Sequence, residues 1–315
     1  MYYIGVDLGG TGIKVGIVDE NGKIVKKDSV PTGAYRPADE IIKDMAGLCK
    51  KLMAEVGLTL EDIKYAGIAS PGSVDADNGV LVYANNLPFE NYPLAAKFSE
   101  FSGIEKVYIE NDANAAAKGE AEMGAAKGCA NSVMITLGTG VGGGIIIDKK
   151  VYSGHNYAGA ELGHTVIQVD GAQCSCGRRG CWEAYSSATG LINMTKAKMN
   201  EAADSKMWEI AGSLDKVNGK TAFDAMRMGD IAGIEVVDKY IKYLACGLVN
   251  MINIFQPEVI VIGGGVCKEG ENLTVPLQKY IDREDYARSN KKRTNVKIAT
   301  LGNDAGIIGA AMLGL

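Results

Sequence analysis

The same pattern of strand, turn and strand occurs twice in this sequence. Residues 3–24 read YIGVDLGGTGIKVGIVDENGKI and residues 133–152 read VMITLGTGVGGGIIIDKKVY. In both copies, two apolar and β-branched runs flank a turn of glycine and threonine, and an acidic turn follows the second run. Self-similarity of this kind predicts two domains of one duplicated design. The length of 315 residues agrees, because a single core rarely serves so long a chain.

Strands and helices are expected to alternate along the rest of the chain. The first copy continues as a hairpin meander into a run at 23–30, and apolar residues at helical spacing extend from Asp39 to Val56. An alanine-rich segment with high helix propensity follows Asp112. A second helical pattern extends from Glu235 to Ile254. The further expected strands are 65–69, 107–109 and 259–262, and the whole predicts a mixed α/β fold.

Charge and hydropathy exclude several classes of protein. Lys and Arg number 33 against 38 Asp and Glu, which gives a net charge of −5 without any basic block. Nucleic acid is therefore not expected as a partner. No run of 18 apolar residues and no basic leader is present, so we expect a cytoplasmic protein without a membrane partner. Three of the seven cysteines fall within residues 174–181, which favours thiolate ligands over a disulfide framework.

The two turns of glycine and threonine are candidates for binding phosphate. Backbone N–H groups without a neighbouring Cβ can surround phosphate oxygens, and the threonine hydroxyls add donors. One such turn alone is more typical of a plain hairpin, but two matched turns favour the phosphate interpretation. Asp7 precedes the first turn, where a carboxylate can hold Mg²⁺, whereas Lys14 is expected to be structural on the returning strand. The turns comprise Gly9, Gly10 and Thr11, and Gly138, Thr139 and Gly140.

Asn111 and Asp112 stand where an expected strand meets an expected helix. Both residue types are good helix N-caps, which is the structural interpretation. The functional interpretation uses the same position, because a carboxylate at a helix N-terminus stays ionised and can accept a proton from a substrate hydroxyl. Asp112 is therefore a candidate general base.

The most specific motif combines one histidine with three cysteines. His164 precedes Cys174 by ten residues, and Cys176 and Cys181 complete the group. Three thiols and an imidazole at this spacing predict a tetrahedral Zn²⁺ site with all four positions filled. A filled site is structural, so zinc is not expected to perform the chemistry.

Polar residues near the cysteines suit a ligand with several hydroxyl groups. Glu161 and Glu183 bracket the predicted metal loop, and the metal would hold both carboxylates in place. Carboxylates, an imidazole and amides together can pair with the hydroxyls of a sugar. Each of these residues taken alone is more typical of an ordinary surface. The candidate set is Asn85, Asn86, Glu161, His164 and Glu183.

These motifs together resemble the ROK family of repressors, open reading frames and sugar kinases, and the resemblance spans nearly the whole chain. It implies the actin-like, ribonuclease-H-like ATPase fold with two similar lobes and a cleft between them. The lobes implied are residues 1–112 joined by the last helix at about 303–315, and residues 113–302 with the metal loop. The motifs are DLGGTGIKVGIVD, ASPGSVD, NNLPF, ENDANAAAKGE, LGTGVGGGIIID, GAELGH, CSCGRRGCWE, VIGGGV and DAGIIGAAML.

Within the family the details are most similar to the glucokinases, which implies ATP-dependent phosphorylation of glucose to glucose 6-phosphate. The resemblance makes Asp112 the base that takes the proton of the sugar 6-hydroxyl. It implies ATP, Mg²⁺ and a structural Zn²⁺ as cofactors, and a homodimer. The implied sugar ligands are Asn86, Asn111, Asp112, Glu161, His164 and Glu183. The implied nucleotide ligands are Asp7, Gly9, Gly10, Thr11, Gly138, Thr139, Gly140, Gly264 and Gly265. The implied metal ligands are His164, Cys174, Cys176 and Cys181.

Three alternatives stay open at this point. Another sugar, such as N-acetylmannosamine, fructose, mannose or allose, can take the place of glucose in the same class of enzyme. A sugar sensor without catalysis would keep the sugar ligands and lose the base or the phosphate turns, yet both are present here. An actin-like ATPase that drives partner binding would give no reason for the metal loop.

Overall fold

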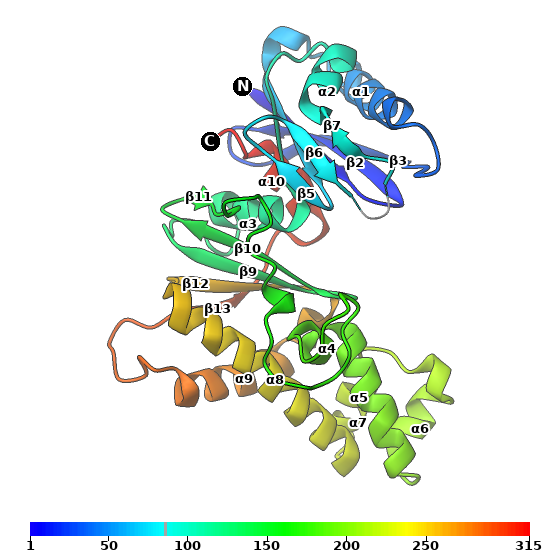
Figure 1. Ribbon diagram of the computed structural model, residues 1–315, viewed down its shortest axis with the longest axis vertical. Coiled ribbons are helices and arrows are strands. Elements are labelled where there is room, and N and C mark those ends of the chain that lie inside the picture. Colours follow the sequence, from blue (N-terminus) through cyan, green and yellow to red (C-terminus); the bar gives the residue numbers. More distant parts are fainter. Residues whose placement is uncertain (85–86) are drawn as a thin grey trace. The chain divides into compact units, whose positions relative to one another are not determined.

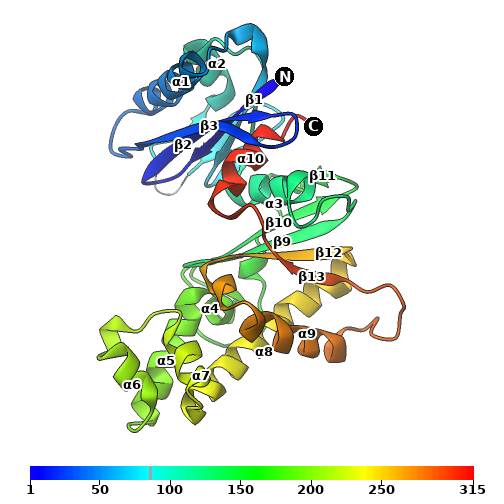
Figure 2. The ribbon, with the colours of Figure 1, turned by 180° about the vertical axis from the view of Figure 1, so that it is seen from behind.

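The computed structural model describes residues 1–84 and 87–315 (Figures 1 and 2). Contacts within the chain divide it into two compact units. Unit 1 comprises Met1–Met134, Gly144–Ala160 and Ala299–Leu315, and unit 2 comprises Ile135–Gly143 and Glu161–Ile298. This is not the same division as the lobes 1–112 with 303–315, and 113–302. Those lobes remain a proposal about which segments act together.

Unit 1 is built on a five-stranded sheet with the order β3-β2-β1-β4-β8. The first three strands form an antiparallel meander, as the sequence predicted, while β1, β4 and β8 are parallel. Parallel strands need crossover connections, which the helices between them provide. The strands are β1 (Tyr2–Leu8), β2 (Gly12–Asp19), β3 (Ile24–Pro31), β4 (Ile63–Ser70) and β8 (Val107–Asn111).

Helices cover both faces of this sheet (Figures 1 and 2). On β1, Ile4 and Val6 belong to the core on the side of α1 (Ala38–Glu55) and α2 (Leu94–Ser102). Tyr3 belongs to the core on the opposite face, with α10 (Ala305–Ala311). Because successive strand residues alternate between faces, Gly5 and Asp7 also lie on the side of α10.

The last helix packs backbone against backbone. A Cβ atom on Gly5 of β1 or on Gly67 of β4 would overlap a carbonyl oxygen of α10. Gly309 of α10 in turn lies against the carbonyl oxygen of Ala115 in α3 (Asp112–Met123). Residues without side chains permit this approach at no steric cost. The last helix thus packs closely against β1, β4 and α3.

A small antiparallel sheet with the order β5-β6-β7 completes unit 1. Its strands are β5 (Ser73–Asp75), β6 (Val80–Tyr83) and β7 (Glu90–Tyr92).

The second large sheet has the order β11-β10-β9-β12-β13, which repeats the order of the first sheet strand for strand. Its first hairpin partners, β10 and β11, are antiparallel, and its last pair, β12 and β13, is parallel. The duplicated design predicted from the sequence is therefore confirmed at the level of topology. The strands are β9 (Ser132–Leu137), β10 (Val141–Ile147), β11 (Lys150–Val151), β12 (Val259–Gly264) and β13 (Asn295–Ile298).

The helices of unit 2 include the longest one, α8 (Ile231–Phe255). It begins four residues earlier than predicted, because the Asp230 side chain accepts a hydrogen bond from Gly233 N at 2.8 Å and caps it. None of the helices in the described residues is long and apolar enough to cross a membrane. The others are α4 (Glu183–Ser186), α5 (Ala188–Glu201), α6 (Lys206–Ala211), α7 (Thr221–Arg227) and α9 (Glu271–Glu284).

The close packing of α10 predicts opposite effects for two helical glycines. Gly309→Ala should lower the free energy of unfolding by about 1–3 kcal/mol, because its methyl group would overlap the backbone of α3. Gly47→Ala on α1 is the control: its Cβ meets nothing within 4 Å, so about 0.5–1 kcal/mol of stabilisation is expected. Urea unfolding of both variants measures the difference. Equal stability of the two variants would contradict the packing argument.

Candidate functional site

The first turn, Gly9–Thr11, joins β1 to β2 and is held by the residue that follows β3. Gly9 N donates to Gly12 O at 2.9 Å, which closes the turn. Thr32 is fully buried, and its hydroxyl donates to Gly9 O at 2.6 Å while its backbone N donates to Thr11 O at 3.1 Å. The turn is therefore rigidly supported. Thr32 was not predicted from the sequence, because nothing in its local pattern identifies the distant turn as its partner.

Asp7 lies at the end of β1, on the face that α10 covers. A Cβ on Gly306 would lie 2.8 Å from its carboxyl carbon, so the start of α10 closely approaches this carboxylate. Lys14 is its register partner on β2, and the two side chains form an ion pair at 2.9 Å. Lys14 thus lies on the returning strand, as expected.

The junction of β8 and α3 presents Asp112 as the first residue of a helix. Asn111 is the N-cap, since its Oδ1 accepts hydrogen bonds from Ala113 N at 2.9 Å and from Asn114 N at 3.4 Å. Its Nδ2 donates to Gly72 O at 3.0 Å. The capping interpretation is therefore confirmed for Asn111. Oδ1 of Asp112 accepts from Ala113 N at 2.8 Å, so its carboxylate stands at the positive end of the helix dipole.

The second turn, Gly138–Gly140, joins β9 to β10 within unit 2. Gly138 N donates to Gly140 O at 3.0 Å, so this turn is closed by residues two apart, whereas the first is closed by residues three apart. The start of α5 holds this turn, because Ala188 N donates to Gly138 O at 2.8 Å and the Thr189 hydroxyl donates to Thr139 O at 2.8 Å. Gly264, at the end of β12, lies against the backbone of Leu137, where any Cβ would overlap it. The predicted residues Gly264 and Gly265 are thus brought beside the second turn.

Glu183 connects this turn to the cysteine loop. Its Oε2 accepts from Val141 N at 2.9 Å, and its Oε1 accepts from the Ser175 hydroxyl at 3.1 Å. The carboxylate lies so near Gly140 that a Cβ there would overlap Oε2. One side chain therefore fixes the distance between a predicted phosphate turn and the predicted metal loop.

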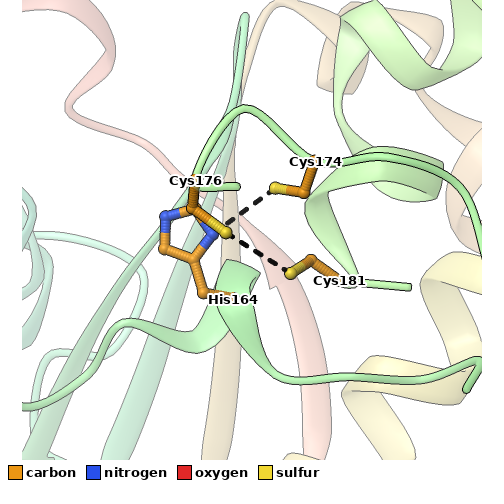
Figure 3. Close-up of side chains that lie close together, drawn as sticks. All are labelled: His164, Cys174, Cys176 and Cys181. Atoms are coloured by element: carbon orange, nitrogen blue, oxygen red, sulfur yellow. Dashed lines mark hydrogen bonds between the residues drawn. The ribbon is translucent and has the colours of Figure 1, made fainter. Parts of the chain in front are cut away.

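His164 and the three cysteines converge as predicted (Figure 3). Their ligand atoms all lie within 4.8 Å of one another. The sulfurs of Cys176 and Cys181 are 3.7 Å apart, and Nδ1 of His164 is 3.8 Å from the sulfur of Cys174. Tetrahedral zinc with Zn–S bonds of about 2.3 Å places its sulfurs about 3.8 Å apart. The side chains thus fit a zinc ion.

The environment of the thiols differs from one cysteine to the next. The backbone N–H of Arg178 holds the pKa of Cys176 below its ordinary value. Burial raises the pKa of Cys181 to about 12. Cys176 is exposed and Cys174 and Cys181 are buried, so the cluster lies at the protein surface with only one of its thiols open to solvent.

Trp182 anchors the loop between its last cysteine and Glu183. It is fully buried, and its Nε1 donates to Tyr243 O in α8 at 3.0 Å. Its ring covers Gly247 so closely that a Cβ there would overlap it. The anchoring role of Trp182 was not predicted from the sequence. A large aromatic residue between a metal ligand and a functional carboxylate was the available signal.

Glu161 directly precedes the short 3₁₀ turn Leu162–His164, and one of its carboxylate oxygens is 4.0 Å from Nε2 of His164. The imidazole therefore turns Nδ1 to the cysteines and Nε2 towards Glu161. Asn85 and Asn86 lie outside the described residues. Within unit 2 the structure gathers Glu161, His164, the cysteines, Glu183 and the second turn, while Asp7, the first turn, Asn111 and Asp112 belong to unit 1.

Comparison with known proteins agrees with this arrangement. The sequence matches the ROK family over residues 3–315. It is 39% identical to the glucokinase of Thermotoga maritima over 312 residues, covering 98% of this chain and 96% of the relative. The solved ROK family glucokinase from Streptomyces griseus, in complex with glucose and AMPPNP, is 34% identical with a TM-score of 0.79 and 99% of each chain covered. The xylose repressor of Bacillus subtilis is 26% identical, with 99% of this chain and 76% of the repressor covered.

The repeated sheet order and these similarities define the actin-like ATPase fold. The resemblance seen in the sequence motifs is thereby confirmed. This chain belongs to the ROK family.

Proposed function

We infer that this protein transfers the γ-phosphoryl group of ATP to glucose and produces glucose 6-phosphate. The observation that carries the inference is its identity of 34–39% to glucokinases over nearly the full length, one of them solved with glucose and an ATP analogue. The repressor relative is less similar, at 26%. A sugar kinase is therefore favoured over a sugar sensor.

Asp112 is the proposed general base. Phosphoryl transfer asks the protein mainly to align the acceptor and to stabilise charge, and a positioned base contributes a factor of about 10²–10⁴. Its place at the start of α3 favours the ionised carboxylate, which then takes the proton of the 6-hydroxyl as that oxygen attacks the phosphorus.

The two glycine turns are proposed to bind the phosphates of ATP. Their backbone N–H groups and the hydroxyls of Thr11 and Thr139 supply donors for phosphate oxygens. Asp7 would hold Mg²⁺ directly or through water, and the ion would neutralise charge on the phosphates. Gly265, whose Cβ would meet nothing within 4 Å, leaves room for the nucleotide beside the second turn.

Zinc held by His164, Cys174, Cys176 and Cys181 is proposed as a structural ion. All four positions would be filled by protein atoms, so zinc would shape the loop and take no part in phosphoryl transfer. Glu161, His164 and Glu183 are the proposed ligands of the sugar hydroxyls. The imidazole would serve both purposes, with Nδ1 on the metal and Nε2 on the sugar. We further propose a cytoplasmic homodimer with a place in glycolysis, and no nucleic-acid or membrane partner.

Asp112→Asn should keep the fold, because asparagine is tolerated at a helix N-terminus, while it removes the proton acceptor. We expect kcat to fall by orders of magnitude with little change in the affinity for glucose. Steady-state kinetics with ATP and Mg²⁺ measure this. A variant that retains more than about a tenth of the wild-type kcat would refute the base assignment.

The zinc proposal predicts about one tightly bound Zn²⁺ per chain. Cys176→Ser should lose it, and the activity should fall because Glu183 loses part of its support. Cys246→Ser is the matched control, since that cysteine is exposed on α8 outside the cluster and its loss should change nothing. Elemental analysis of the purified proteins measures the metal. A fully active preparation without zinc would contradict the proposal.

The acceptor proposal predicts a strong dependence on the 2-position of the sugar. A site built to pair hydroxyls rejects an analogue that lacks one, because buried polar groups are then left unpaired. The value of kcat/KM should fall from glucose to 2-deoxyglucose and fall further for N-acetylated amino sugars, while the KM for ATP stays constant. Faster phosphorylation of N-acetylmannosamine than of glucose would assign the enzyme to another acceptor and leave fold, base and metal proposals unaffected.

A further inference from the structure

Glu110, the residue before Asn111, is a buried carboxylate without a role in the proposed chemistry. It is 6% exposed and lies at the end of β8. Burial raises its pKa, and the hydrogen bonds that it accepts oppose this effect. Burying a carboxyl group is unfavourable unless its oxygens are well paired. The hydrogen bonds that Glu110 accepts therefore indicate why a carboxylate is present at this buried position.

One oxygen of Glu110 binds a backbone N–H before Asp112 and a side-chain amide after it. Oε1 accepts from Asn111 N at 2.8 Å and from Asn114 Nδ2 at 3.1 Å. Asn114 is 2% exposed, and its own Oδ1 finds no partner among the described residues. Leaving a buried amide oxygen unpaired is costly. The side chain keeps this orientation because its Nδ2 donates to Glu110. The residue before Asp112 and the residue two positions after it are thus tied to a single atom.

The other oxygen of Glu110 holds a surface loop. Oε2 accepts from the Ser153 hydroxyl at 3.1 Å. The loop is closed on itself, because Gly159 N donates to Ser153 O at 2.8 Å, and the Tyr157 hydroxyl donates to Asp77 at 2.8 Å. Tyr157 and Ala160 both have positive φ, a conformation that costs energy for residues other than glycine. The loop then continues directly into Glu161.

We propose that Glu110 is a positioning residue, which clamps the peptide around Asp112 and the loop 153–160 to one buried carboxylate. The proposal rests on the role of Asp112 as the base. A displacement of about 1 Å at a reacting group can reduce the rate about 10²-fold. Glu110→Leu should therefore lower kcat about 10- to 100-fold and leave the KM for ATP unchanged. Glu110→Gln should restore kcat, because an amide can accept both N–H groups through oxygen and donate to Ser153.

Glu120, on the helix α3 that Asp112 begins, provides a matched control. It is 1% exposed and accepts from the backbone N of Thr300 at 2.9 Å and of Leu301 at 2.8 Å, at the other end of α3. Glu120→Leu should lower the melting temperature at least as much as Glu110→Leu does, with kcat nearly unchanged. An equal loss of kcat in both variants would show that Glu110 acts only on stability and would overturn the proposal.

A double-mutant cycle decides the question. Once Asp112→Asn has removed the base, Glu110 has nothing to position, so Glu110→Leu should cost less than about twofold in that background. A loss as large as in the wild-type background overturns the proposal. If Glu110→Leu does not fold, Ser153→Ala replaces it, and its smaller loss of kcat should vanish in the same background. The proposed function fails separately, if the wild-type protein does not phosphorylate glucose or Asp112→Asn is fully active.

Discussion

The contact of α10 with the first sheet and with α3 is the constraint on which unit 1 depends. The last segment of the chain returns to the first strand, and its backbone meets β1, β4 and α3 at positions that have no side chain. Asp7 and Asp112 belong to two of these elements. The core of the sheet therefore also determines where the two carboxylates with proposed chemical roles stand.

Unit 2 differs from unit 1, because its candidate functional groups lie largely outside helices and strands and must be held in place by other contacts. The cysteine loop has only isolated bridges, Val166 with Cys181 and Gln173 with Arg179. Two side chains substitute for a sheet there. Trp182 fixes the loop to α8 by filling the space over Gly247, and Glu183 fixes it to the second turn by hydrogen bonds. The residues proposed to bind metal and sugar are thereby held at a few points only.

Much of this was predictable from the sequence, because periodicity and repetition are local properties. The duplicated pattern predicted two domains of one design, which the matching strand orders of the two sheets bear out. The spacing of His164 and the cysteines predicted their convergence. Contacts that join distant segments could not be foreseen. Thr32, directly after β3, supports the first turn, and Glu183 accepts a hydrogen bond from a backbone N–H forty-two residues away. Nothing in the local pattern of either residue specifies its partner. Asn111 is the opposite case, because its role as a helix N-cap was predicted from the local sequence and is found in the structure.

The attachment of the cysteine loop has a consequence for how such a protein can diversify. The loop contributes no strand to either large sheet, so substitutions between its cysteines leave the sheet registers and the backbone contacts of α10 untouched. New side chains there can alter the surface offered to a ligand while Trp182 and Glu183 keep the loop in place. Ligand selectivity and folding are therefore separable in this chain. Point substitutions in the loop can change the selectivity for a ligand while the packing that stabilises the fold stays the same.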